Sequence, residues 1–149
     1  FLKNDDYLLS VEANERSITH KFAEHLQNIL GYTWNVDCEY NRYGRGSKMQ
    51  DTKIIEEIEQ IVGKDTTTSE TETKTVYPDI IVHKRGSDGQ NLVVIEAKKD
   101  AKKKEREDDI KKLNRIKDKY NYTFAVFLNF KTENEQDVEI LLFSHNEKI

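Results

Sequence analysis

The feature that most constrains the fold is the run Leu-Val-Val-Ile at residues 92–95, which ends directly at Glu96-Ala97-Lys98. An extended segment presents successive side chains on opposite faces of a sheet, so a run that is apolar at every position is apolar on both faces. Such a run predicts a strand in the middle of a sheet with layers packed on either side. Glu96 and Lys98 are two residues apart and therefore point the same way, at the end of a buried strand.

A second strand is predicted shortly before the first. Residues 77–82 read Tyr-Pro-Asp-Ile-Ile-Val, and Pro78 fits only at the start of a strand, where its missing N–H is harmless. Residues 83–91 contain two glycines and several polar turn formers, which favours a hairpin between the two strands. Antiparallel pairing across that hairpin is expected to bring Asp79 beside Glu96.

An aspartate and a glutamate brought together at strand ends suit Mg²⁺, which prefers oxygen ligands and commonly takes one or two carboxylates with water and substrate phosphate. Lys98 adds an ammonium beside such a cation. The Lys98 ammonium can orient an attacking water, help to deprotonate it, or offset charge on a phosphate, while the metal polarises a phosphoryl oxygen. The combination indicates hydrolysis of a phosphodiester bond.

Pro78-Asp79 followed by Glu96-Ala97-Lys98 resembles the signature of the PD-(D/E)XK nucleases, the restriction-endonuclease-like superfamily. The resemblance implies that Asp79 and Glu96 hold the metal, that the carbonyl of Ala97 adds a ligand, and that Lys98 positions or activates the water. The tripeptide alone is not specific. Acidic-x-lysine triplets also begin at Asp51, Glu72, Asp100 and Asp109, but only the one at Glu96 ends an apolar strand that follows a Pro-Asp strand.

Many members of that superfamily carry a further acidic residue on the first helix, here expected at residues 13–30. At 100° per residue from Ile18, the apolar stripe centres near about 50°, Glu15 lies at about 60° and Glu24 at about 240°. A carboxylate that faces a core is costly unless it is paired or bound to metal, so Glu15 is the predicted third acidic residue. The alternative is that Glu15 only caps the first turn of the helix or favours its dipole.

The remaining pattern predicts a single α/β (α+β) domain over residues 1–149, with a central mixed sheet flanked by helices in the order αβββαβ. Strands are expected at 34–40, 124–128 and 138–143, and a helix at 101–120. An insertion at about 47–75 separates the first strand from the Pro-Asp strand. Within it, isoleucine spacing favours a helix at 51–62, and the Thr- and Glu-rich stretch 64–75 is expected to be a loop.

Charge argues against strong nonspecific attraction to nucleic acid, because the net charge is −4. Two local groups of basic and aromatic side chains are nevertheless candidates for nucleic-acid contacts. One lies near the glycine-rich loop and the other follows the motif: Arg42, Tyr43, Arg45, Lys99, Lys102 and Lys103. For the lysines that open the helix, the alternative interpretation is an ordinary solvated face.

The predicted function is a Mg²⁺-dependent endonuclease, with Mn²⁺ as a substitute metal, that acts on DNA in restriction, repair or defence; RNA stays open as a substrate. A homodimer would suit the cutting of two antiparallel strands. The alternative is a catalytically silent nuclease-fold module that binds nucleic acid or a protein within a larger assembly. No long apolar segment predicts a membrane partner, and the single cysteine, Cys38, fits a reducing cytoplasm.

Overall fold

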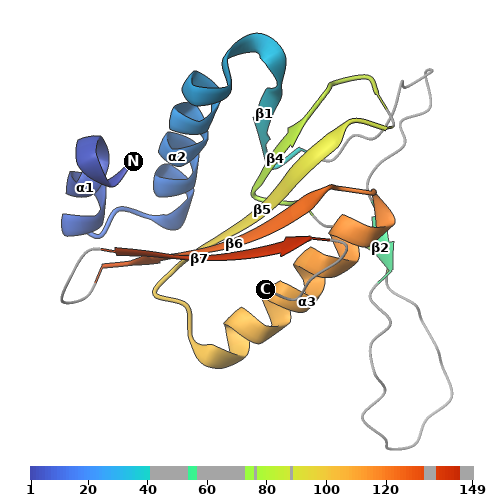
Figure 1. Ribbon diagram of the computed structural model, residues 1–149. Coiled ribbons are helices and arrows are strands. Elements are labelled where there is room, and N and C mark those ends of the chain that lie inside the picture. The colour runs from blue at the N-terminus through green and yellow to red at the C-terminus, as the bar shows by residue number, and fades with distance from the viewer. Residues whose placement is uncertain (41–53, 57–72, 76, 88, 133–136, 145–149) are drawn as a thin grey trace, which may run out of the picture.

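The computed structural model describes residues 1–40, 54–56, 73–75, 77–87, 89–132 and 137–144 (Figure 1). Along the chain these residues form helices α1 (Leu2–Ser10), α2 (Glu15–Leu30) and α3 (Lys103–Lys119), a short 3₁₀ turn at Gly31–Thr33, and strands β1 (Asn35–Cys38), β2 (Ile54–Glu56), β3 (Thr73–Thr75), β4 (Ile80–His83), β5 (Asn91–Lys99), β6 (Phe124–Lys131) and β7 (Asp137–Ser144).

Five of the strands form one mixed sheet in the order β1-β4-β5-β6-β7. Neighbours are antiparallel except for β5 and β6, which are parallel. Parallel neighbours need a crossover connection, and α3 supplies it. The prediction of a mixed sheet flanked by helices is confirmed. Leaving aside β2 and β3, which form a separate two-stranded sheet, the predicted order of helix, three strands, helix and strand is found from α2 to β6. The apolar run at 92–95 lies in β5, which is the central strand.

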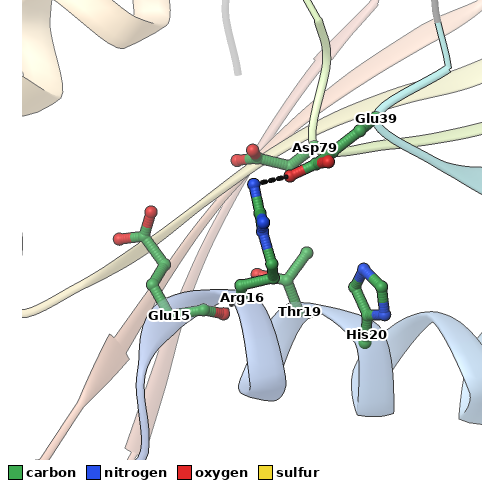
Figure 2. A pocket seen from close by; sticks show the side chains of 6 residues that line it. All are labelled: Glu15, Arg16, Thr19, His20, Glu39 and Asp79. Carbon is green, nitrogen blue, oxygen red and sulfur yellow. Dashed lines mark hydrogen bonds and ion pairs between the residues drawn. The ribbon is translucent and has the colours of Figure 1, made fainter.

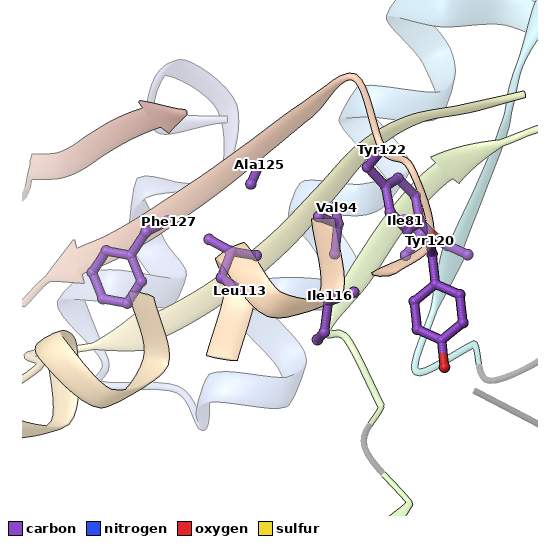
Figure 3. Packing of buried hydrophobic residues seen from close by; sticks show 8 residues of the cluster. All are labelled: Ile81, Val94, Leu113, Ile116, Tyr120, Tyr122, Ala125 and Phe127. Carbon is purple, nitrogen blue, oxygen red and sulfur yellow. The ribbon is translucent and has the colours of Figure 1, made fainter. Parts of the chain in front are cut away.

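Each face of the sheet carries its own hydrophobic core. Figure 3 shows the core between α3 and the sheet, in which Leu113 and Ile116 of the helix pack on Val94 and Phe127 of the strands. On the opposite face, Ile18 of α2 packs with residues of β4, β5 and β6. The ribbon places α1 and α2 on one side of the sheet and α3 on the other (Figure 1). Successive side chains of β5 therefore point alternately into the two cores.

The local sequence explains where α2 begins and ends. The Asn14 side chain accepts a hydrogen bond from the Ser17 N–H at 2.8 Å and caps the first turn. The helix stops at Gly31, whose φ of 59° lies in the left-handed region that favours glycine. The predicted helix over 13–30 is confirmed for residues 15–30, with Asn14 as its cap. Helix α1 was not predicted, although its buried Leu9 extends the core under α2.

The predicted helix at 51–62 is wrong where it can be compared, because residues 54–56 form strand β2. This strand pairs with β3, so the predicted loop at 64–75 is also wrong at residues 73–75. Adjacent β-branched residues such as Ile54 and Ile55 favour an extended backbone, and this local preference competes with the helical spacing of the isoleucines. The other residues of both predictions lie outside the described part of the chain.

Among the described residues, no helix is both long enough and apolar enough to cross a bilayer.

Candidate functional site

The register of β4 and β5 brings the two predicted carboxylates together. Ile80 pairs with Ile95 in antiparallel register, so Asp79, one residue before Ile80, lies opposite Glu96, one residue after Ile95. The Ala97 N–H donates a hydrogen bond to Asp79 Oδ2 at 2.8 Å, which fixes the aspartate against β5. We call Asp79, Glu96, Lys98 and Glu15 the candidate site. The predicted hairpin between the two strands brings Asp79 and Glu96 of this site together.

Glu96 is the most buried ionisable residue of the candidate site, with 2% of its surface exposed. Its Oε1 accepts a hydrogen bond from Lys112 Nζ on α3 at 2.7 Å. Its other oxygen, Oε2, is buried and has no hydrogen-bond partner among the described residues. A buried carboxylate oxygen without a partner is costly, so Oε2 is available to a cation.

Lys98 lies between the two helices that flank the sheet. Its Nζ is 3.5 Å from Glu15 Oε1 on α2 and 4.0 Å from an oxygen of Asp109 on α3. Glu96 and Lys98 both reach side chains of α3, as expected for residues two apart on one strand. The predicted shared face of the motif residues is therefore confirmed.

Glu15 joins the end of β5, as the helical wheel indicated. Its Oε2 accepts a hydrogen bond from the backbone N–H of Lys99 at 3.1 Å, in addition to the Lys98 ion pair. Asn14 caps α2, and Glu15 lies in its first turn, so the contacts of Glu15 with β5 come in addition to the favourable interaction with the helix dipole that was the alternative. Glu24 faces solvent and pairs with Lys21, which agrees with its rejection.

A small open pocket lies beside Asp79, between α2 and the end of β1 (Figure 2). Arg16 extends across it and forms a 2.8 Å ion pair with Glu39, and Glu15, Thr19 and His20 complete its lining. Glu39 has a φ of 49°, an uncommon left-handed conformation for a residue with a side chain. Arg16, Glu39 and His20 were not among the site residues predicted from the sequence; His20 is exposed.

Burial and like charge act together on the two acidic residues. Burial raises the pKa of Asp79, against the opposing effects of the Ala97 N–H and the Lys98 charge. Burial, with the negative charge of Asp79 next in importance, raises the pKa of Glu96 to about 7, although Lys112 opposes both. Without a cation, ionising this pair is therefore unfavourable.

Lys98 remains a cation in this setting. Its burial favours the neutral amine, but the charges of Glu15 and Asp109 outweigh that effect and raise its pKa above the ordinary lysine value. The lysine of the motif is thus held as an ammonium that can donate hydrogen bonds.

The donor chemistry of the site fits a hard divalent cation. Mg²⁺ needs only one or two carboxylates from the protein, and Asp79 and Glu96 supply two, one of them with an oxygen that has no hydrogen-bond partner in the described part of the chain. In the described part of the chain, no group of three or more His, Cys, Asp or Glu side chains is gathered closely enough to hold a metal. The metal roles of Asp79, Glu96, Glu15 and the Ala97 carbonyl accordingly stay predictions.

Two further residues of the site were not predicted from the sequence. Asp109 and Lys112 are three residues apart on α3 and so share a face, from which they reach Lys98 and Glu96 respectively. A helical wheel drawn for α3 in the same way gives a signal for Asp109, which lies about 35° from the centre of the apolar stripe of that helix. Lys112 lies at the margin of that stripe, about 95° from its centre, where a charged residue is ordinary and gives no signal of a role.

The predicted nucleic-acid contacts divide into two groups. Arg42, Tyr43 and Arg45 lie outside the described residues. Lys102 and Lys103 are exposed at the start of α3, whereas Lys99 Nζ donates to the carbonyl oxygens of Glu12 and Ala13 at 3.3 and 3.4 Å. Their contacts with nucleic acid stay predictions.

Substitution of Glu96 by glutamine is expected to change how stability depends on pH. Between the ordinary carboxyl pKa and about 7, the folded protein binds more protons at Glu96 than the unfolded chain does, so this residue makes stability fall as pH rises through that range. The loss reaches about 3 kcal/mol at one pKa unit per 1.36 kcal/mol. Urea unfolding in EDTA from pH 4.5 to 8 should therefore give a flatter profile for Glu96→Gln than for the wild type. An unchanged profile would contradict the burial penalty, and Glu107→Gln, at an exposed position on α3, is the control.

Comparisons of the chain with protein-family models, with curated proteins and with solved structures gave no match. Function is therefore inferred from the chemistry of the site residues.

Proposed function

We propose that this chain is a metal-dependent nuclease of the PD-(D/E)XK type, which hydrolyses phosphodiester bonds of DNA with Mg²⁺. The observation that carries the proposal is the pairing of Asp79 with Glu96 across two strands, with Lys98 two residues further along the same strand. Of the five acidic-x-lysine triplets in the sequence, only the one at Glu96 ends an apolar run that follows a Pro-Asp segment.

Asp79 and Glu96 would hold the cation, which when bound polarises the phosphoryl oxygen and lowers the pKa of a water. The protein supplies the rest. The Ala97 N–H holds the Asp79 carboxylate by one oxygen, and burial of Glu96 excludes water from its side chain. Both arrangements fix the acidic pair before any substrate binds.

Lys98 acts as a positively charged donor. Its raised pKa keeps the proton on Nζ, so it orients the attacking water or stabilises charge on the phosphate through hydrogen bonds. Glu15 and Asp109 hold this ammonium from two sides. Glu15 thereby serves as a positioning residue for Lys98.

The pocket beside Asp79, which is lined by the carboxylates of Glu15, Glu39 and Asp79, also offers one guanidinium as a phosphate contact, that of Arg16. Arg16 and His20 come from the exposed side of α2 and lie next to the candidate site (Figure 2). A guanidinium suits bidentate contact with a phosphate, and its present partner, Glu39, is about half exposed. Such a pair is weak enough for a phosphate to replace Glu39.

A cleavage assay tests the proposal. The purified chain is incubated with supercoiled, linear and branched DNA and with single-stranded RNA, in Mg²⁺, in Mn²⁺ and in EDTA. Cleavage of at least one DNA substrate with either metal, and none in EDTA, is expected. Failure to cut any nucleic acid would overturn the proposal. Metal binding without cleavage would favour the alternative of a silent nuclease-fold module.

A further inference from the structure

Lys112 is a second lysine that contacts a carboxylate of the candidate site, and it lies outside the Glu96-Ala97-Lys98 motif. It comes from the middle of α3, and its Nζ donates to Glu96 Oε1 at 2.7 Å, while Glu96 itself is 2% exposed. Lys98 has different partners, Glu15 and Asp109. The two lysines therefore do not duplicate each other, and of these two it is Lys112 that donates a hydrogen bond to the buried carboxylate.

The contact divides the two oxygens of Glu96 between two roles. Oε1 is taken by Lys112, and Oε2 is buried without a partner among the described residues. Fixing one oxygen of a carboxylate fixes the direction of the other. Residues that hold metal ligands by hydrogen bonds in this way commonly orient them and tune their affinity.

The net charge of the groups around Glu96 is also compatible with a bound divalent cation. Four carboxylates and two ammoniums gather at this end of the sheet: Asp79, Glu96, Glu15, Asp109, Lys98 and Lys112. With all of these groups ionised, the cluster carries two net negative charges, which one divalent cation neutralises. The cluster therefore keeps enough negative charge for such a cation even with the Lys112 ammonium present.

We propose that Lys112 is a positioning residue that holds Glu96 by Oε1 and turns Oε2 toward a divalent cation. The inference rests on the proposed function, because it assigns a residue to the metal site of that function. Lys112 itself touches neither metal nor substrate in this role.

Titration of the metal-free protein with Mg²⁺, followed by calorimetry, tests this role without reference to cleavage. Lys112→Met removes the ammonium and keeps most of the aliphatic side chain, and it should weaken Mg²⁺ binding about 10–100-fold. Lys112→Arg, which keeps a charged donor, should recover most of the affinity. Lys112→Ala should show the same loss as Lys112→Met, and it carries the test if the methionine variant does not fold. Urea unfolding in EDTA identifies the variants that are folded.

Lys111→Met is the matched control. Lys111 is adjacent on the same helix and is 70% exposed, and it pairs with Asp108. Removing its positive charge should leave Mg²⁺ affinity unchanged or slightly higher, so a purely long-range charge effect has the opposite sign to the expected result. If folded Lys112→Met binds Mg²⁺ as tightly as Lys111→Met, the positioning role is wrong.

The experiment also separates the two proposals. If the wild type binds Mg²⁺ and the Lys112 variants bind it equally well, only the role of Lys112 fails. If the wild type binds no Mg²⁺ at millimolar concentration, the proposed function and the role of Lys112 fail together.

Discussion

Asp79→Asn is expected to lower the rate of metal-dependent cleavage by on the order of 10³-fold or more, because the proposed cation, which would activate the attacking water and polarise the phosphate, would lose a charged ligand. The change is nearly isosteric. The asparagine oxygen can still accept the hydrogen bond from the Ala97 N–H, so the junction between β4 and β5 is retained. Initial rates of DNA cleavage at saturating Mg²⁺ measure the effect.

Stability separates loss of function from loss of fold in this variant. Burial raises the pKa of Asp79, which means that its ionised form is disfavoured in the folded protein. Asp79→Asn should therefore unfold at a urea concentration equal to or higher than that of the wild type near pH 8. Asp108→Asn makes the same chemical change at an exposed position of α3 and should keep full activity. Wild-type cleavage by folded Asp79→Asn would remove Asp79 from the mechanism.

Lys98→Met is expected to lower kcat by about 10²–10⁴-fold while changing Mg²⁺ affinity only slightly. The reason is that, in the proposed mechanism, Lys98 would act on water or phosphate through its ammonium, whereas Asp79 and Glu96 would hold the cation. Methionine keeps an unbranched side chain between α2 and α3 but leaves Glu15 and Asp109 without their shared cation. Both carboxylates are partly exposed, so water can solvate them and the fold is expected to persist.

Lys99→Met is the neighbouring control for Lys98. The Lys99 ammonium contacts backbone carbonyls near the start of α2 rather than the carboxylates of the candidate site. This variant should keep kcat and alter KM at most, through weaker attraction to the DNA backbone. Single-turnover rates that are equal for Lys98→Met and Lys99→Met would show that the motif lysine has no special role.

The parts of the site that follow from strand pairing could be predicted from the sequence. A hairpin with one proline at its start and an apolar run at its end has few registers, and in the observed one Asp79 and Glu96 are opposite each other. The contact of Glu15 was also predictable, because a carboxylate in the apolar stripe of a helix faces the sheet and is expected to find a polar partner there. Both inferences use only the periodicity of a single element and its neighbour.

The partners supplied by α3 could not be predicted in the same way. Which strand residues meet Lys112 depends on how far α3 slides and rotates over the sheet, and this is set by the packing of Leu113 and Ile116 in the core rather than by local sequence. The error at residues 54–56 has a different origin. Isoleucines spaced for a helix are also β-branched, and pairing with residues 73–75, far along the chain, favours the strand.

The central claim is that Asp79 and Glu96 together hold one divalent cation. Anomalous scattering from crystals of the protein grown or soaked with Mn²⁺ locates the ion directly. The account predicts a single strong peak that contacts a carboxylate oxygen of each residue, with Oε2 as the ligand from Glu96 and with the Lys98 ammonium facing the same space. The account would be contradicted if Mn²⁺ were bound to other residues and no peak lay between Asp79 and Glu96.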